Sequence, residues 1–100
     1  MRKATKQLAI SKTVKEAVRR RDGCCCVLCG SPYGLPNAHY IARSQGGLGI
    51  EENVVTLCER CHMEYDQSCK RKELKARLRD YLQSFYPDWD EHKLIYRKGM

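Results

Sequence analysis

Four cysteines at repeated spacing are the residues of this sequence with the clearest capacity for chemistry. They form two C-x-x-C pairs, Cys26 with Cys29 and Cys58 with Cys61. This spacing allows two thiolates from one turn to bind a single tetrahedral Zn²⁺. Residues 30–57 separate the pairs, a longer gap than the roughly 15–20 residues of a simple four-cysteine zinc site. We therefore expect a structural zinc site with a further segment inserted between its two halves.

Three more cysteines complicate the choice of ligands. Cys24 and Cys25 stand directly before the first pair, and either could compete for the metal. We prefer Cys26 and Cys29, because only this pair has the two-residue spacing and a glycine directly after it. Cys69 lies outside both pairs, and we expect no role for it. Four buried, reduced thiols without a metal are the alternative interpretation.

The inserted segment and the residues after it carry groups suited to phosphodiester hydrolysis. The segment contains His39 and Asn53, and His62 and Asp66 follow in the chain. Hydrolysis needs an activated water, an electrophile for the phosphate and neutralisation of the leaving oxygen. A histidine, with an ordinary pKa of about 6.5, is a suitable base at neutral pH. A hard divalent cation with oxygen or imidazole ligands suits the other two tasks.

The order of these residues resembles the HNH endonucleases, the ββα-metal or His-Me finger group of metal-dependent DNA-cleaving enzymes. It is similar to their compact, zinc-bearing members, which are common in phages and prophages. The resemblance covers roughly residues 13–66 and extends loosely beyond them. The stretches that carry it are Cys26-Val27-Leu28-Cys29-Gly30, His39-Tyr40-Ile41-Ala42-Arg43-Ser44-Gln45-Gly46-Gly47, Asn53, and Cys58-Glu59-Arg60-Cys61-His62.

The resemblance implies a role for each residue of the inserted segment. By position, His39 is the general base, Asn53 holds the backbone that orients this base, and His62 binds the catalytic metal. Asp66 lies one helical turn after His62 on the same face, where members of the family often place another ligand. The implied cofactors are a structural Zn²⁺ and a catalytic Mg²⁺, Mn²⁺ or another divalent metal.

Ala38 departs from the pattern of the family. The family usually has Asp or His at this position as a metal ligand, and alanine cannot coordinate a metal. Three explanations are open: the metal is held by His62, Asp66, waters and the substrate phosphate; His39 is itself a ligand; or catalysis is lost. The first suits Mg²⁺ or Mn²⁺, which tolerate many waters.

Basic residues gather at both flanks of the motif, and the formal net charge is +7. A basic surface attracts polyanions, and DNA is the commonest of these in the cytosol. The alternative is ordinary solubilising charge on a solvated helix face. The residues expected to contact DNA are Arg43 and Arg60 beside the motif and Lys70, Arg71 and Lys72 in the C-terminal flank.

The expected location is the cytoplasm of a bacterial or phage-infected host cell, with no membrane partner. No apolar run approaches the roughly 18 residues of a membrane span, and the N-terminus lacks the apolar segment of a secretory signal. In a reducing compartment, C-x-x-C pairs indicate metal ligands before disulfides. The resemblance adds phage packaging proteins as partners.

The helices and strands that must position these residues are expected to form a small α+β domain. It has a ββα-metal core clamped by the four-cysteine zinc site, with flanking N- and C-terminal helices. Residues 1–12 are expected to be a flexible basic arm, and 13–100 a single nuclease domain with a motif core at 24–66 and a helical extension at 67–100. Helices are expected at 13–21, 59–66 and along an apolar stripe that Pro87 ends. Residues 24–27 and 37–42 are expected to be β-structure, 44–52 a glycine-rich loop and 54–57 a strand or extended chain. A small helix is expected to start at Asp88.

The function predicted is a divalent-metal-dependent DNA endonuclease that hydrolyses phosphodiester bonds. A non-catalytic zinc module that binds nucleic acid or protein is the competing class, and Ala38 and the basic charge favour it. A redox protein using C-x-x-C is a third class, which poorly explains two pairs with a histidine directly after the second.

Overall fold

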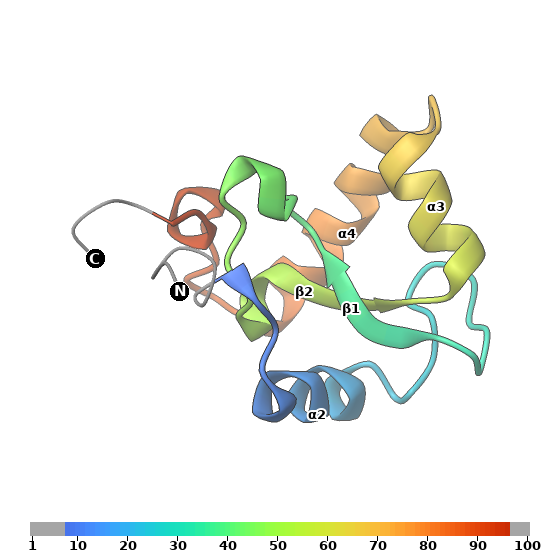
Figure 1. Ribbon diagram of the computed structural model, residues 1–100, viewed down its shortest axis with the longest axis horizontal. Coiled ribbons are helices and arrows are strands. Elements are labelled where there is room, and N and C mark those ends of the chain that lie inside the picture. The colour runs from blue at the N-terminus through green and yellow to red at the C-terminus, as the bar shows by residue number, and fades with distance from the viewer. Residues whose placement is uncertain (1–7, 97–100) are drawn as a thin grey trace.

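A β-hairpin followed by a helix lies at the centre of the structure, a computed structural model that describes residues 8–96. In the chain, one long helix precedes this hairpin-and-helix unit and another follows it (Figure 1). This confirms the predicted small α+β fold. The main elements are α2 Lys12–Arg21, β1 Leu35–His39, β2 Val54–Leu57, α3 Glu59–Gln67 and α4 Arg71–Phe85, with 3-10 turns η1 Arg43–Gln45, η2 Glu51–Asn53 and η3 Glu91–Leu94.

The two strands pair antiparallel and differ in how they are buried. Residues 54–57, Val-Val-Thr-Leu, are all buried, and their β-branched side chains suit a packed sheet. In β1 the burial alternates, because successive side chains of a strand point to opposite faces. Ala38 therefore faces the core opposite Val55, whereas Asn37 and His39 share the other face.

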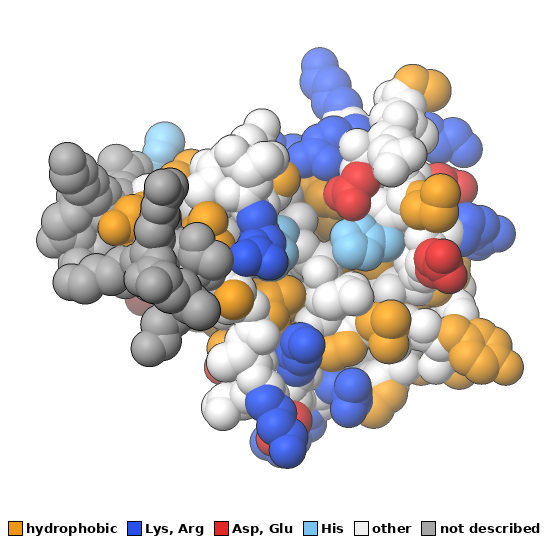
Figure 2. Space-filling model, viewed as in Figure 1, with side chains coloured by type: hydrophobic (Ala, Val, Ile, Leu, Met, Phe, Trp, Pro, Cys, Tyr) orange, Lys and Arg blue, Asp and Glu red, His pale blue; other side chains and the backbone are white. Residues whose placement is uncertain are grey.

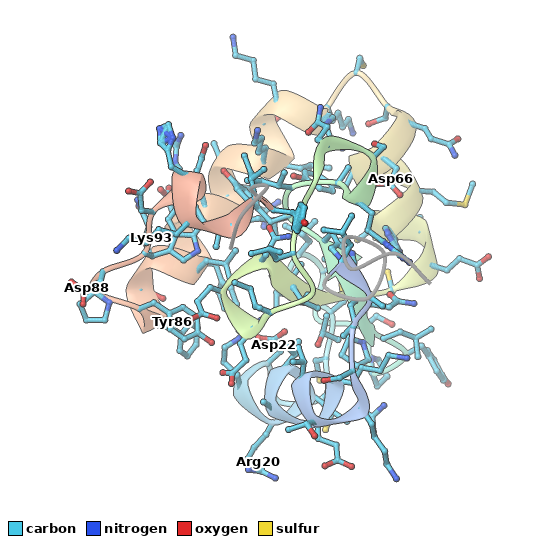
Figure 3. All side chains as sticks on the ribbon, turned by 60° about the vertical axis from the view of Figure 1, so that its left-hand side comes forward. Arg20, Asp22, Asp66, Tyr86, Asp88 and Lys93 are labelled. Atoms are coloured by element: carbon cyan, nitrogen blue, oxygen red, sulfur yellow. The ribbon has the colours of Figure 1, made fainter. Side chains whose placement is uncertain are left out.

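A buried ion pair fastens α2 to the hairpin. Arg21 Nε and Nη2 donate to the Asp22 carboxylate at 2.7 and 3.0 Å, and Arg21 also donates to the carbonyl of Val54. Asp22 accepts two further hydrogen bonds, from the backbone N–H of Thr56 and the hydroxyl of Tyr81 on α4. Figure 3 shows Asp22 where α2 meets the rest of the fold. The pair thus fixes the relative positions of α2, β2 and α4.

Helices α3 and α4 pack together beside the hairpin. The apolar stripe of α4 buries Leu74, Leu78 and Leu82, as the helical spacing predicts. Tyr65 of α3 is fully buried, and its hydroxyl donates to the carbonyl of Tyr40 at 2.6 Å. Because Tyr40 directly follows His39, this bond fixes the distance between α3 and the end of β1.

Two predicted segments differ from the structure. Residues 24–27 form turns and no strand, because Gly23 and Cys24 both have left-handed backbone conformations, with φ of 67° and 62°, which turn the chain away from an extended path. The predicted strand at 37–42 lies at Leu35–His39, since the chain after His39 turns into the loop that η1 occupies.

The remaining predicted elements are present in the structure. The N-terminal helix begins at Lys12, α3 ends at Gln67, and the stripe of α4 ends before Pro87. The small C-terminal helix is the 3-10 turn η3, and Leu94 packs back into the core. Residues 1–7 of the predicted arm lie outside the described residues. Across residues 8–96, none of the helices combines the length and the apolar character required to cross a membrane.

Candidate functional site

The four predicted zinc ligands form one cluster. All four Sγ atoms of Cys26, Cys29, Cys58 and Cys61 lie within 4.8 Å of one another, and those of Cys29 and Cys58 are 3.6 Å apart. Four sulfurs bound to Zn²⁺ at about 2.3 Å lie about 3.8 Å apart in a tetrahedron. The cluster therefore has the dimensions and the ligand set of a structural zinc site.

Local structure explains why these cysteines converge. Gly30 donates its N–H to the carbonyl of Cys26 at 2.8 Å, and its φ of 80° suits glycine, so the first pair sits in a tight turn. Cys58 precedes the first residue of α3, and Cys61 lies in the first turn of that helix. The hydrogen bond from Val27 N to the carbonyl of Thr56 brings the two halves together.

The electrostatics of the cysteine cluster favour the binding of a cation. Burial opposes ionisation of Cys26, but backbone N–H groups of Cys58, Cys29 and Leu28 lower its pKa to about 7. Burial raises the pKa of Cys61, and the neighbouring thiols raise it further. The Cys26 thiolate therefore forms readily while the Cys61 thiol resists ionisation, and a divalent cation would relieve the repulsion between four thiolates.

A second site lies on another part of the surface, in a pocket of about 560 Å³. It is formed by the exposed face of β1, the loop of η1, α3 and the start of α4. Figure 2 shows histidine side chains exposed on this face, with Lys and Arg side chains around them. The lining residues are Asn37, His39, Ala42, Arg43, Ser44, Gln45, His62, Asp66 and Arg71.

His62 and Asp66 form a close pair on α3. The Nε2 atom of His62 lies 3.3 Å from Oδ2 of Asp66, and both side chains remain partly open to solvent. Adjacent ligand atoms around a six-coordinate Mg²⁺, at about 2.1 Å from the ion, lie about 3 Å apart. The distance between the two atoms is therefore close to that between neighbouring ligands of one cation. Figure 3 shows Asp66 on α3.

His39 is half-buried at the end of β1. Burial lowers its pKa below the ordinary 6.5, and the nearby charges of Arg43 and His62 lower it further, while a hydrogen bond with Leu8 acts in the opposite direction. That bond joins Nε2 of His39 to the carbonyl oxygen of Leu8 at 2.8 Å. The net effect keeps the ring neutral, and so able to accept a proton, at neutral pH.

Asn53 is fully buried beneath the loop that follows His39. Its Oδ1 accepts the N–H of Ile41 at 2.8 Å, and its Nδ2 donates to the carbonyls of Leu48 and Ile41 at 2.8 and 3.2 Å. Its backbone carbonyl accepts the N–H of Tyr40 at 2.7 Å. Asn53 therefore clamps both ends of the loop and the residue adjacent to His39, without contacting the imidazole through any of these bonds.

Ala38 and Asn37 occupy opposite faces of β1. Ala38 is fully buried in the core, so its side chain does not line the pocket. Asn37, which the sequence reasoning overlooked, lines the pocket together with His39. The two-residue period of a strand, applied backwards from His39, is the signal that would have identified it.

The residues expected to contact DNA lie in three places. Arg43 and Arg71 line the pocket, although Arg71 also donates to the carbonyl of Tyr65 at 2.9 Å and stacks over its ring. Lys70 and Lys72 are exposed around the start of α4. Arg60 lies at the cysteine cluster, where a hydrogen bond with Cys61 and the charge of Cys29 raise its pKa.

The described residues thus form a ββα fold with a four-cysteine cluster that has the ligand set of a zinc site, and with a separate pocket that holds two histidines and a carboxylate. Residues 26–68 match the model of the HNH endonuclease family. The members of this family are described as endonucleases. The matched segment includes both cysteine pairs and His39, Asn53, His62 and Asp66. No match to a curated protein was found.

Proposed function

We propose that this protein is a divalent-metal-dependent DNA endonuclease that hydrolyses phosphodiester bonds with His39 as general base. The observation that carries the proposal is the pocket itself. It brings His39 from the hairpin and His62 and Asp66 from α3 to one hollow, within the segment that matches the HNH endonuclease family. The cysteine cluster is separate from this pocket and would hold the structural Zn²⁺.

The donor set in the pocket suits a hard cation. His62 and Asp66 provide an imidazole nitrogen and a carboxylate oxygen at the spacing of neighbouring ligands. The side chain of Asn37 adds an amide oxygen on the same wall, which would compensate for the missing ligand at Ala38. Waters and a substrate phosphate would complete the coordination. When bound, the cation would neutralise charge on the phosphate and on the leaving oxygen.

The remaining side chains prepare the attack and hold the substrate. A neutral His39 would take a proton from the attacking water, and Asn53 would keep the backbone next to it in place through its three side-chain hydrogen bonds. Arg43 and Arg71 line the same pocket and would attract phosphates on either side of the cleaved bond. Lys70 and Lys72 would extend this basic surface along the DNA.

Cleavage of supercoiled plasmid tests the proposal. The zinc-loaded protein is incubated with Mg²⁺, Mn²⁺ or Ni²⁺, or with EDTA, and conversion to nicked or linear DNA is followed. We expect conversion with a divalent metal and none in EDTA. DNA binding without cleavage under every metal condition would instead support the alternative, a non-catalytic zinc module that binds nucleic acid.

The role of Asn37 has a separate test. Asn37→Ala should raise the metal concentration needed for half of the maximal cleavage rate, while saturating metal restores the rate. Leu35→Ala, on the same face of the strand but outside the lining of the pocket, serves as the control. An unchanged metal dependence in Asn37→Ala would remove this residue from the ligand set.

The biological setting follows from the resemblance and not from the pocket. We propose that residues 13–100 act as one nuclease domain of the compact phage or prophage type, working in the cytoplasm, with packaging proteins as candidate partners. Co-purification with packaging proteins from phage-infected cells, lost in mock-infected cells, is the result that this setting predicts.

A further inference from the structure

The imidazole of His39 is held by a segment far from it in the sequence. Its Nε2 atom lies 2.8 Å from the carbonyl oxygen of Leu8, which precedes α2 and lies outside the segment that matches the nuclease family. A carbonyl oxygen can only accept a hydrogen bond, so Nε2 must carry the proton. In the neutral ring this leaves Nδ1 as the nitrogen with a free lone pair.

Close backbone packing around Gly49 holds the carbonyl of Leu8 in place for this contact. Gly49 is buried beneath residues 8 and 9, and a Cβ atom at Gly49 would lie 2.2 Å from the carbonyl oxygen of Ala9 and 2.9 Å from that of Leu8. The chain can approach so closely because position 49 has no side chain. Two residues further on, Ser11 caps α2 by accepting the N–H of Val14, so the chain directly after the contact is anchored as well.

We propose that the backbone carbonyl of Leu8 is a positioning group of the active site, which fixes the neutral tautomer of His39 with Nδ1 as the proton acceptor. The proposal rests on the proposed function, in which His39 is the base. It extends the active site to the N-terminal segment, which contributes through its backbone. The opposite possibility for the same contact is a cover over the base, in which removing Leu8 would free Nε2 and speed cleavage.

Two substitutions disturb the carbonyl without altering the imidazole. Gly49→Ala places a methyl group against residues 8 and 9. Ala9→Pro acts differently: Leu8 has a helical backbone conformation, which a following proline disfavours, so its carbonyl must turn. Ala9→Ser is the matched control, because the side chain of Ala9 is exposed and serine does not restrict Leu8.

The first readout is the tautomer, which does not depend on activity. Long-range ¹H–¹⁵N spectra of the full chain at about pH 8, well above the ordinary histidine pKa of about 6.5, separate the two tautomers. We expect the Nε2–H form of His39 in the wild type and in Ala9→Ser, and a mixture in Gly49→Ala and Ala9→Pro. Zinc content and melting temperature, measured on each variant, show that the fold is intact.

The second readout is the cleavage rate. We expect kcat to fall about 10–100-fold in Gly49→Ala and Ala9→Pro with KM nearly unchanged, the scale of loss for a misplaced catalytic group. A wild-type tautomer and kcat in both folded variants would overturn the proposal, and faster cleavage would overturn it in favour of a cover. If the wild type cleaves no DNA, the proposed function fails, while the tautomer of His39 still decides whether Leu8 orients the ring.

Discussion

Truncating Asn53 tests whether this residue holds the loop that follows His39. Asn53→Ala removes three side-chain hydrogen bonds, at 2.8, 2.8 and 3.2 Å, to the backbone of Ile41 and Leu48. Each contributes about 1 kcal/mol net, and each buried backbone group left without a partner costs about 1–3 kcal/mol. Because water can enter the space and satisfy part of this demand, we predict a loss of about 3–5 kcal/mol in the free energy of unfolding, a large share of the roughly 5–15 kcal/mol of a typical domain.

Urea unfolding with saturating zinc, followed by circular dichroism, measures this loss as a lower midpoint at an unchanged slope. Thr56→Val is the matched control, because the buried hydroxyl of Thr56 has no hydrogen-bond partner among the residues that the structure describes. The control removes an unsatisfied polar atom at similar volume and should leave stability unchanged or raise it. A loss under about 1 kcal/mol for Asn53→Ala, the net contribution of one hydrogen bond, would refute the reasoning that Asn53 is the clamp of this loop.

Three further predictions concern the metal, the pH and the charge. Cys58→Ser should lose the bound zinc and most of the folded state, because metal binding supplies folding free energy in small zinc domains, while Cys69→Ser, at an exposed cysteine, should keep both by elemental analysis and circular dichroism. A wild-type protein that is well folded without metal would contradict the zinc assignment. The pKa of His39 is lowered by burial, and a base must be unprotonated, so the cleavage rate should rise with pH through a pKa below 6.5 and be constant at neutral pH; an inflection above 6.5 would contradict this. Lys70→Glu with Lys72→Glu should weaken DNA binding and flatten its salt dependence with little change in melting temperature, and an unchanged salt titration would make these lysines a solvated surface.

The fold could be predicted from the sequence where local patterns decide it. The apolar spacing of Leu74, Leu78 and Leu82 specifies one face of α4, and the paired cysteine spacing places four sulfurs in one cluster. The boundaries near residues 24–27 could not be predicted, because they depend on the left-handed conformations of Gly23 and Cys24. Nothing in the sequence marks the second of these, since cysteine rarely adopts a positive φ.

The sequence indicated which residues would gather at the candidate site, but not the contacts that they make. Residue types and order point to His39, Asn53, His62 and Asp66, and the structure brings the two histidines and Asp66 to one pocket with Asn53 beneath the adjacent loop. The partner of His39 Nε2 is a backbone carbonyl from residue 8, and backbone groups carry no sequence signal.

Charge shows the same limit of sequence reasoning. Arg21 belongs to the basic N-terminal flank by composition, yet it is paired with Asp22 in the interior. Arg60 is at the cysteine cluster rather than in the pocket. Only tertiary contacts distinguish a basic residue that faces solvent from one that is already paired, so a count of basic residues in a flank does not show which of them are free to meet an anion.

The most direct test of the central claim compares plasmid cleavage by wild type, His39→Ala and His62→Ala across a titration of Mg²⁺ or Mn²⁺. We predict that His39→Ala keeps its zinc, its fold and its DNA binding but cleaves about 10²–10⁴-fold more slowly, the usual contribution of a general base, at every metal concentration. His62→Ala should be defective because it binds the catalytic metal weakly, so its defect should shrink as metal is raised. Rescue of His39→Ala by metal would make His39 a ligand instead of the base, and wild-type rates in both variants would contradict the assignment of the site.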